Sequence, residues 1–270
     1  MLFAKKSLGQ NFLITPRIVE MIALAGEIQP GETVVEIGPG KGVLTTQLLH
    51  AGARVIAIEK DDRLIPILSD LFKEEIAAEK LILIHKDVME VSETDLSAIS
   101  GTTYKVIANI PYYITGQIIR TFLSRTHQPK TMILMVQKEV ANRTIARDGK
   151  ESILSLSVKI FATPSLVMNV SRGNFFPIPN VDSAVIKLSD IHNPFSDSGK
   201  NADADETRRA ENRFFSFVKA GFAQKRKKLI SNLEAVEDRA KLTQKFLDLK
   251  LDENTRAEDV SLEVWKKLSA

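Results

Sequence analysis

The sequence predicts an α/β fold with a largely parallel sheet, followed by a small domain made only of helices. Short β-branched runs alternate with helical patterns through the first part of the chain, which is typical of parallel strands joined by crossover helices. One of these runs, 34–37, leads straight into a glycine-rich turn. We expect the α/β domain over 1–189, a flexible linker rich in small polar residues over 190–206, and the helical domain over 207–270.

The composition is that of an ordinary globular protein, since 44% of the 270 residues are hydrophobic and 26% are charged. The net charge of +3 is small, so any contact with nucleic acid must come from a local cluster. Without cysteine there is no disulfide or thiolate zinc site, and the four histidines are scattered, so we expect no metal. No signal-peptide core or membrane-spanning apolar run is present. We therefore expect a cytoplasmic monomer that does not bind membranes.

The glycine-rich turn after the first strand predicts a ligand site. Glycines stand at positions 38, 40 and 42. They have no Cβ atom, so a ligand can approach the backbone, and the N-terminus of the helix expected over 43–49 favours polar or anionic groups. The G-x-G-x-G spacing and Pro39, which has no amide hydrogen, count against a pyrophosphate cradle. A tight turn without a ligand is the alternative interpretation.

Acidic residues follow the next two strands of the predicted sheet. The strand at 54–58 ends at Glu59, 21 positions after Gly38. A carboxylate placed there can accept hydrogen bonds from both hydroxyls of a ribose. Asp87 comes just after the strand at 81–84, where it could accept a hydrogen bond from an adenine amine. These residues predict an adenosine-type ligand, and the alternatives are a surface carboxylate for the first and a helix cap for the second.

The fourth strand, 105–108, runs into the most informative motif, Asn109-Ile110-Pro111-Tyr112. The exocyclic nitrogen of adenine is a poor nucleophile, so a transfer site needs acceptors where positive charge develops on it. The Asn109 side-chain carbonyl and the Ile110 backbone carbonyl could both accept from this amine. Tyr112 could stack on the base. A plain loop with a buried tyrosine is the alternative.

An aromatic loop lies between the last two strands of the domain. Strands are expected at 131–136, 167–170 and 181–188, the last of them at the edge of the sheet. The loop reads Phe175-Phe176-Pro177-Ile178-Pro179. We expect it to form a base-stacking wall opposite Tyr112, and the alternative is a loop that packs into the core.

The second domain contains an acid-free basic stretch, 217–233. Helices are expected over about 207–223, 226–234 and 238–249, with a last one capped by Ser261. On such a helix the densest basic residues would cover a full turn and contact RNA phosphates, whereas the alternative is an ordinary solvated face. These residues are Lys225, Arg226, Lys227 and Lys228.

Four spaced motifs of this chain resemble those of the ribosomal RNA adenine N6-dimethyltransferases. They are Gln10–Leu13, Glu36–Gly42, Asn109–Tyr112 and Phe175–Ser183. The match spans nearly the whole chain, and the basic C-terminal segment makes the bacterial small-subunit branch the most similar. The resemblance implies a Rossmann-like, S-adenosylmethionine-dependent methyltransferase. Its substrate would be N6 of two adjacent adenosines near the 3′ end of 16S rRNA in the small ribosomal subunit, with a role in ribosome assembly.

The resemblance also implies roles for single residues. The cofactor site would be lined by Asn11, Leu13, Gly38, Glu59, Asp87 and Asn109. The catalytic set would be Asn109 with Tyr112 and Phe175, the two rings flanking the target base.

Three other interpretations stay open. The related large-subunit enzyme that confers macrolide resistance usually has V-N-S where this chain has Val181-Asp182-Ser183. A non-catalytic RNA-binding assembly factor would keep the fold without the transfer, and the intact Asn109–Tyr112 motif argues against it. A nicotinamide dehydrogenase is disfavoured by the glycine spacing and by Pro39.

Overall fold

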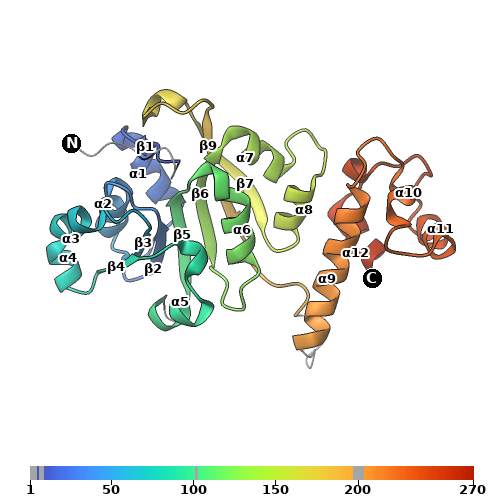
Figure 1. The fold of residues 1–270 in the computed structure, drawn as a ribbon, viewed down its shortest axis with the longest axis horizontal. Helices are drawn as coiled ribbons and strands as arrows, with labels where there is room; N and C mark the ends of the chain where they lie inside the picture. The colour runs from blue at the N-terminus through green and yellow to red at the C-terminus, as the bar shows by residue number, and fades with distance from the viewer. Residues whose placement is uncertain (1–4, 6–8, 101–102, 197–203) are drawn as a thin grey trace. The chain divides into compact units, whose positions relative to one another are not determined.

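The structure, a computed structural model, describes residues 5, 9–100, 103–196 and 204–270, and in these the chain folds around a mixed sheet of seven strands (Figure 1). The strand order is β4-β3-β2-β5-β6-β9-β7. The strands are β2 (Thr33–Ile37), β3 (Arg54–Glu59), β4 (Leu81–His85), β5 (Tyr104–Asn109), β6 (Thr131–Gln137), β7 (Thr163–Val170) and β9 (Ser183–Ser189).

The five strands from β2 to β6 are parallel to one another, as the β-branched runs predict. Buried hydrophobic side chains fill the central strands because helices cover a parallel sheet on both faces. The predicted α/β class is therefore confirmed. Helices α1 to α7 are α1 (Pro16–Ala25), α2 (Val43–His50), α3 (Ile65–Leu71), α4 (Lys73–Ala77), α5 (Glu93–Ser100), α6 (Thr115–Leu123) and α7 (Lys138–Ile145).

The last strand of the domain is not at the edge of the sheet, so this prediction from the sequence was wrong. β9 lies between β6 and β7 and is antiparallel to both. Most of its side chains are buried, whereas β7 alternates exposed and half-buried residues, which is typical of an edge strand. The alternation of exposed and half-buried residues therefore identifies β7 as the edge strand, whereas the order of the strands along the chain does not.

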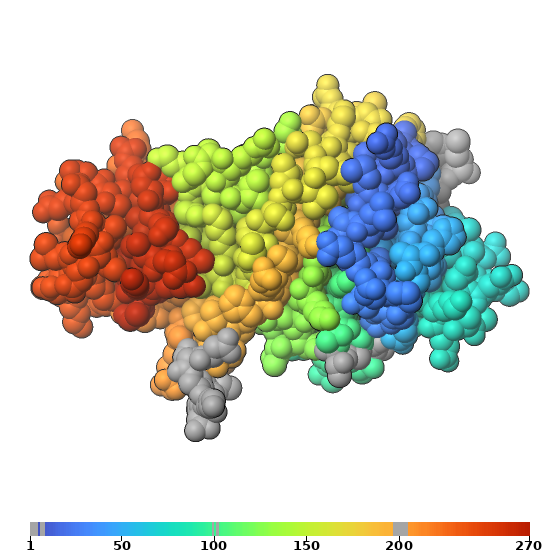
Figure 2. All heavy atoms as spheres, turned by 180° about the vertical axis from the view of Figure 1, so that it is seen from behind, coloured from blue at the N-terminus to red at the C-terminus, as the bar shows by residue number. Residues whose placement is uncertain are grey.

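A second, two-stranded sheet joins the N-terminal segment to the aromatic loop. β1 (Phe12–Leu13) pairs antiparallel with β8 (Phe175–Phe176). Figure 2 shows the blue N-terminal residues side by side with the yellow residues that include β8. Thr15 precedes α1 as expected, but its hydroxyl donates to Asn174 Oδ1 at 2.8 Å and does not cap the helix. Residues about 160 positions apart are thus held together by this hydrogen bond and by the strand pairing.

The chain divides into two compact units, 1–141 with 162–191 and 142–161 with 192–270. The helical unit therefore includes residues 142–161, a division that differs from the boundaries expected at 189 and 207. Part of the expected linker lies outside the described residues. The helices of this unit are α8 (Ile153–Lys159), α9 (Ala204–Gly221), α10 (Leu229–Leu233), α11 (Arg239–Asp248) and α12 (Leu262–Ser269).

The helical unit has a core of its own around Trp265. This side chain is fully buried and stacks on Phe222 with 5.8 Å between ring centroids. A Cβ atom at Gly221 would lie 2.3 Å from the Trp265 ring, so the end of α9 has to be glycine for the two helices to pack. Among the described residues, no helix has both the length and the apolar character needed to cross a membrane.

Candidate active site

A pocket of about 1140 Å³, including its solvent-open mouth, lies in the first unit at the carboxyl ends of the parallel strands. This is where ligands bind in open α/β sheets. All six residues expected at the cofactor site line it, together with Tyr112: Asn11, Leu13, Gly38, Glu59, Asp87 and Asn109.

The glycine-rich turn forms the floor of this pocket. Its three glycines all have positive φ angles, which side-chain-bearing residues rarely adopt. A Cβ atom at Gly40 would lie 3.2 Å from the Phe12 ring, and one at Gly42 would lie 2.6 Å from Phe72. The amide of Gly38 donates to the carbonyl of Ile58 at 2.9 Å, which ties the turn to β3. The turn is therefore a cradle that only glycine can build. The amides of its three glycines donate within the protein, to the Ile58 carbonyl, to Glu59 and to the Pro39 carbonyl.

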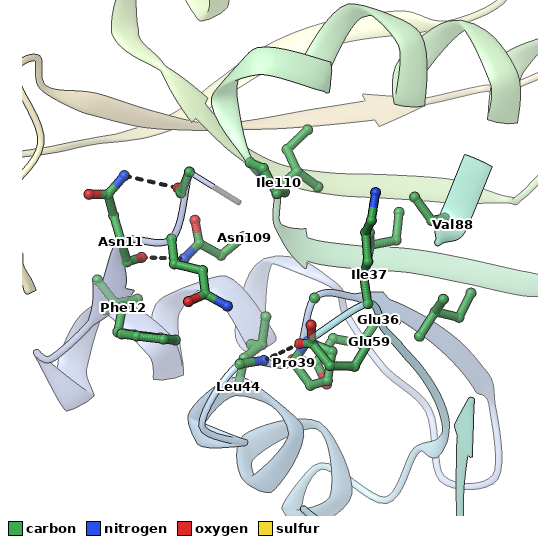
Figure 3. Close-up of a pocket in the computed structure, with 18 of the residues that line it drawn as sticks. Asn11, Phe12, Glu36, Ile37, Pro39, Leu44, Glu59, Val88, Asn109 and Ile110 are labelled. Atoms are coloured by element: carbon green, nitrogen blue, oxygen red, sulfur yellow. Dashed lines mark hydrogen bonds between the residues drawn. The ribbon is translucent and has the colours of Figure 1, made fainter. Parts of the chain in front are cut away.

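Glu59, at the end of β3, is buried beside this turn (Figure 3). Its Oε2 accepts from the Gly40 amide at 3.1 Å, and its Oε1 accepts from the Asp61 amide at 2.8 Å. Burial raises the pKa of this carboxyl, although the backbone hydrogen bonds work in the opposite direction. A carboxylate has about four acceptor sites, so with these backbone bonds the group can still accept from a ligand hydroxyl.

Glu36 is a pocket residue that the sequence analysis did not single out for this role. It lies on β2, is almost fully buried, and accepts a 2.6 Å hydrogen bond from the Thr45 hydroxyl of α2. Burial raises its pKa to about 8, and the nearby charge of Glu59 adds to this while Thr45 opposes it. The sequence contained one signal for this buried carboxyl, a single charged residue within the otherwise apolar run V-V-E-I.

Asp87 lies in the pocket and also caps a short helix. It lines the pocket, and its Oδ1 also caps the short 3₁₀ helix η2 (Val88–Glu90) by accepting from the Met89 amide at 3.0 Å. Lys60 Nζ lies 2.6 Å from Asp87 Oδ2. Burial tends to raise the pKa of this carboxyl, but the hydrogen bonds from Lys60 and Met89 outweigh it and lower the pKa. The residue is thus held as an anion at the rim of the pocket.

The Asn109–Tyr112 motif forms the other side of the pocket. Asn109 ends β5, and its Nδ2 donates to the Asn11 carbonyl at 3.4 Å, which leaves Oδ1 available as an acceptor (Figure 3). Tyr112 begins the 3₁₀ helix η3 (Tyr112–Ile114), and its hydroxyl lies 2.6 Å from Ser183 Oγ. Burial raises the pKa of Tyr112, while the bond to Ser183 opposes this, so the phenol stays neutral near pH 7.

The N-terminal segment lines the pocket and is tied to the turn and to the residues after β3. Gln10 Nε2 donates to Asp61 Oδ2 at 2.8 Å, and Asp61 in turn accepts from both Nε and Nη2 of Arg63. The Lys41 ammonium lies 4.9 Å from the centroid of the Phe12 ring. The Gln10–Leu13 motif therefore lines one part of the pocket and is held there by side-chain contacts.

The two phenylalanines of the aromatic loop have opposite environments, which counts against the expectation that Phe175 stacks on a base. Phe175 is 1% exposed and belongs to the hydrophobic core with Leu13. Phe176 is 62% exposed and Ile178 is 64% exposed. Successive residues of a strand point to opposite faces, so the pairing with β1 decides which ring is buried. Phe176 is therefore the exposed ring of the pair, and neither ring is among the residues that line the pocket.

The basic residues of the second unit lie in a loop, so the expectation that they occupy a helix was wrong. α9 ends at Gly221 and α10 begins at Leu229, and the residues between them have turn or bend conformations. Asn232 fixes this loop because its Nδ2 donates to the carbonyls of Gly221 and Gln224 at 2.6 and 3.1 Å. All four basic side chains are exposed: Lys225, Arg226, Lys227 and Lys228.

The donor set of the pocket fits S-adenosylmethionine and offers no metal cluster. It contains a glycine cradle, buried carboxylates and the amide of Asn109, which suit ribose, amino-acid and purine groups. Within the described ranges, no group of three or more His, Cys, Asp or Glu side chains could hold a metal ion.

Comparisons with known proteins agree with this geometry. The family model described as Ribosomal RNA adenine dimethylase matches residues 1–270. Proteins named "Ribosomal RNA small subunit methyltransferase A" are 38% identical to this chain in Dehalococcoides mccartyi and in Enterococcus faecalis; the alignments cover 98% of this chain, and 87% and 89% of those proteins.

Solved structures show the same fold. A dimethyladenosine transferase from Plasmodium falciparum has a TM-score of 0.75 at 25% identity and covers 95% of each chain. The 23S rRNA methyltransferase ErmE has a TM-score of 0.72 at 23% identity, covering 96% of this chain and 98% of its own, and shows likeness of fold alone.

Proposed function

Because the chain belongs to the ribosomal RNA adenine dimethylase family, we propose that it methylates N6 of two adjacent adenosines near the 3′ end of 16S rRNA in the small ribosomal subunit. Family membership confirms the predicted enzyme class, an S-adenosylmethionine-dependent rRNA adenine dimethyltransferase with a Rossmann-like sheet. What we propose beyond this class is the substrate, two adjacent adenosines of the small subunit, and a monomer as the acting form.

One observation carries the assignment of the pocket residues. The glycine cradle with Glu59 and the Asn109–Tyr112 motif line a single pocket, so a cofactor and a base can meet there. In this assignment Glu59 accepts from the ribose hydroxyls and Asp87 from the adenine amine of the cofactor, beside Asn11, Leu13 and Gly38.

Bound S-adenosylmethionine supplies the methyl group as an electrophilic sulfonium. The target N6 would gain this methyl group in exchange for one proton, which would be released to water. The Asn109 Oδ1 and the Ile110 carbonyl accept hydrogen bonds from the amine as positive charge develops on it. Tyr112 and Phe176 stack on the two faces of the flipped adenine, and the basic loop 225–228 contacts phosphates.

Methylation mapping of both ribosomal subunits tests this function. We expect dimethyladenosine in 16S rRNA of small subunits and none in 23S rRNA. The same assay with Asn109→Ala should show strongly reduced transfer while thermal unfolding stays close to wild type. Methylation of 23S rRNA in place of 16S rRNA would assign the chain to the large subunit, and transfer by Asn109→Ala at the wild-type rate would refute the role of that residue.

A further inference from the structure

A hydrogen bond joins two motifs whose connection the sequence did not reveal. The Tyr112 hydroxyl lies 2.6 Å from Ser183 Oγ, between residues 71 positions apart. Tyr112 is half-buried at the wall of the pocket, whereas Ser183 is fully buried. The bond therefore connects a ring in the site to the interior of the sheet, through the last residue of the Val181-Asp182-Ser183 motif.

The Ser183 end of this bond is held firmly. Ser183 begins β9 and is paired with Gln137 of β6 on one side and Val170 of β7 on the other. The preceding residue adds two contacts, because the Asp182 carbonyl accepts from the Lys138 amide and its Oδ1 accepts from the Arg172 amide, both at 3.0 Å. The Ser183 hydroxyl is therefore held in place, and a hydrogen bond to it can restrain the end of another side chain.

The bond restricts one motion of the tyrosine. The phenol oxygen lies on the long axis of the ring, so rotation about that axis does not move it. Swinging the ring about χ1, in contrast, would carry the oxygen away from Ser183 and break the bond. The bond thus fixes the direction in which the ring points into the pocket, a requirement for stacking on a base whose position is set by the rest of the site.

We propose that Ser183 is a positioning residue that holds the Tyr112 ring in its stacking direction through the hydroxyl–hydroxyl bond. This inference rests on the proposed function, in which Tyr112 stacks on the target adenine. Tyr112→Phe should therefore lower activity, since the phenylalanine ring keeps its stacking surface but loses the hydrogen bond to Ser183. This inference also assigns a role to the serine of the Val181-Asp182-Ser183 motif.

The test is a kinetic double-mutant cycle on small subunits with Ser183→Ala, Tyr112→Phe and the combined variant. Each single variant should lower kcat about fivefold to tenfold, the rate equivalent of one hydrogen bond. The combined variant should lose no more than the worse single one, because both remove the same bond. The KM for S-adenosylmethionine should not change. Ser189→Ala, which removes a hydroxyl at the far end of β9, is the matched control and should keep wild-type kinetics.

The outcomes separate this inference from the proposed function. If the wild-type enzyme methylates small subunits but the combined variant loses the product of the two single losses, the bond does not position the ring and the inference fails. A wild-type kcat in either single variant would also refute the inference. Should Ser183→Ala not fold, Tyr112→Phe removes the same bond from the half-buried side and decides alone. Absence of adenosine methylation by the wild-type protein in either subunit overturns the proposed function, and this inference with it.

Discussion

Replacing Glu59 by alanine should weaken S-adenosylmethionine binding by about 1.5–3 kcal/mol, the range for hydrogen bonds to a charged group. This corresponds to an increase in Kd of about 10- to 160-fold. The structure explains why the loss should be this large. The carboxylate is buried and already fixed by the amides of Gly40 and Asp61, so it needs no further ordering when ribose hydroxyls arrive.

Calorimetry with S-adenosylhomocysteine, which cannot react, measures this loss directly. Glu59→Gln should lie between wild type and alanine, because the amide keeps one acceptor oxygen but directs its NH2 group at a backbone donor. Glu74→Ala removes an exposed carboxylate from α4 of the same unit and serves as the matched control. If Glu59→Ala folded normally and bound the cofactor with wild-type affinity, the ribose contact would have to be assigned elsewhere.

Three further predictions concern the core, the buried acid and the basic loop. Phe175→Ala should lower the free energy of unfolding by about 3–5 kcal/mol in chemical denaturation. Phe176→Ala should leave the free energy of unfolding unchanged and should raise the activation free energy of methylation by about 1–3 kcal/mol. Because the pKa of Glu36 is raised from 4.5 to about 8, its contribution to stability is complete below about pH 4.5 and is lost as the pH rises through 8; the Tm of wild type should therefore fall across this range more steeply than that of Glu36→Gln. Changing Lys225 and Lys228 to glutamate should weaken binding to small subunits in filter assays and lower its salt slope by about 0.7–0.9 per lost phosphate contact, without changing cofactor affinity.

A specific result would contradict each of these three predictions. Equal unfolding free energies for the two phenylalanine variants would contradict the opposite burial of the rings. An unchanged pH dependence of Tm in Glu36→Gln would show that this carboxyl does not titrate in the range stated. An unchanged salt slope would make the basic loop an ordinary solvated surface.

The sequence alone predicted the parallel sheet and the place of the pocket. β-branched runs, glycine spacing and the acids that follow strands are local signals, and the rule that ligands bind at the carboxyl ends of parallel strands turns them into a site. The cofactor residues inferred from the motifs all line one pocket for this reason. The motif resemblance led to the family that the comparisons then showed.

Other properties depend on which distant segments pack together, and only the tertiary structure decided them. Phe175 and Phe176 are chemically identical neighbours, and the pairing of β8 with β1 determines which one enters the core. Ser183 looks like an ordinary strand residue until β9 is seen beside β6, which brings its hydroxyl to Tyr112. Burial beneath the glycine turn likewise raises the pKa of Glu36, an effect that no residue adjacent to it in the chain indicates. Helix and strand patterns follow from interactions between near neighbours in the chain, whereas burial and long-range hydrogen bonds require the sheet to be assembled first.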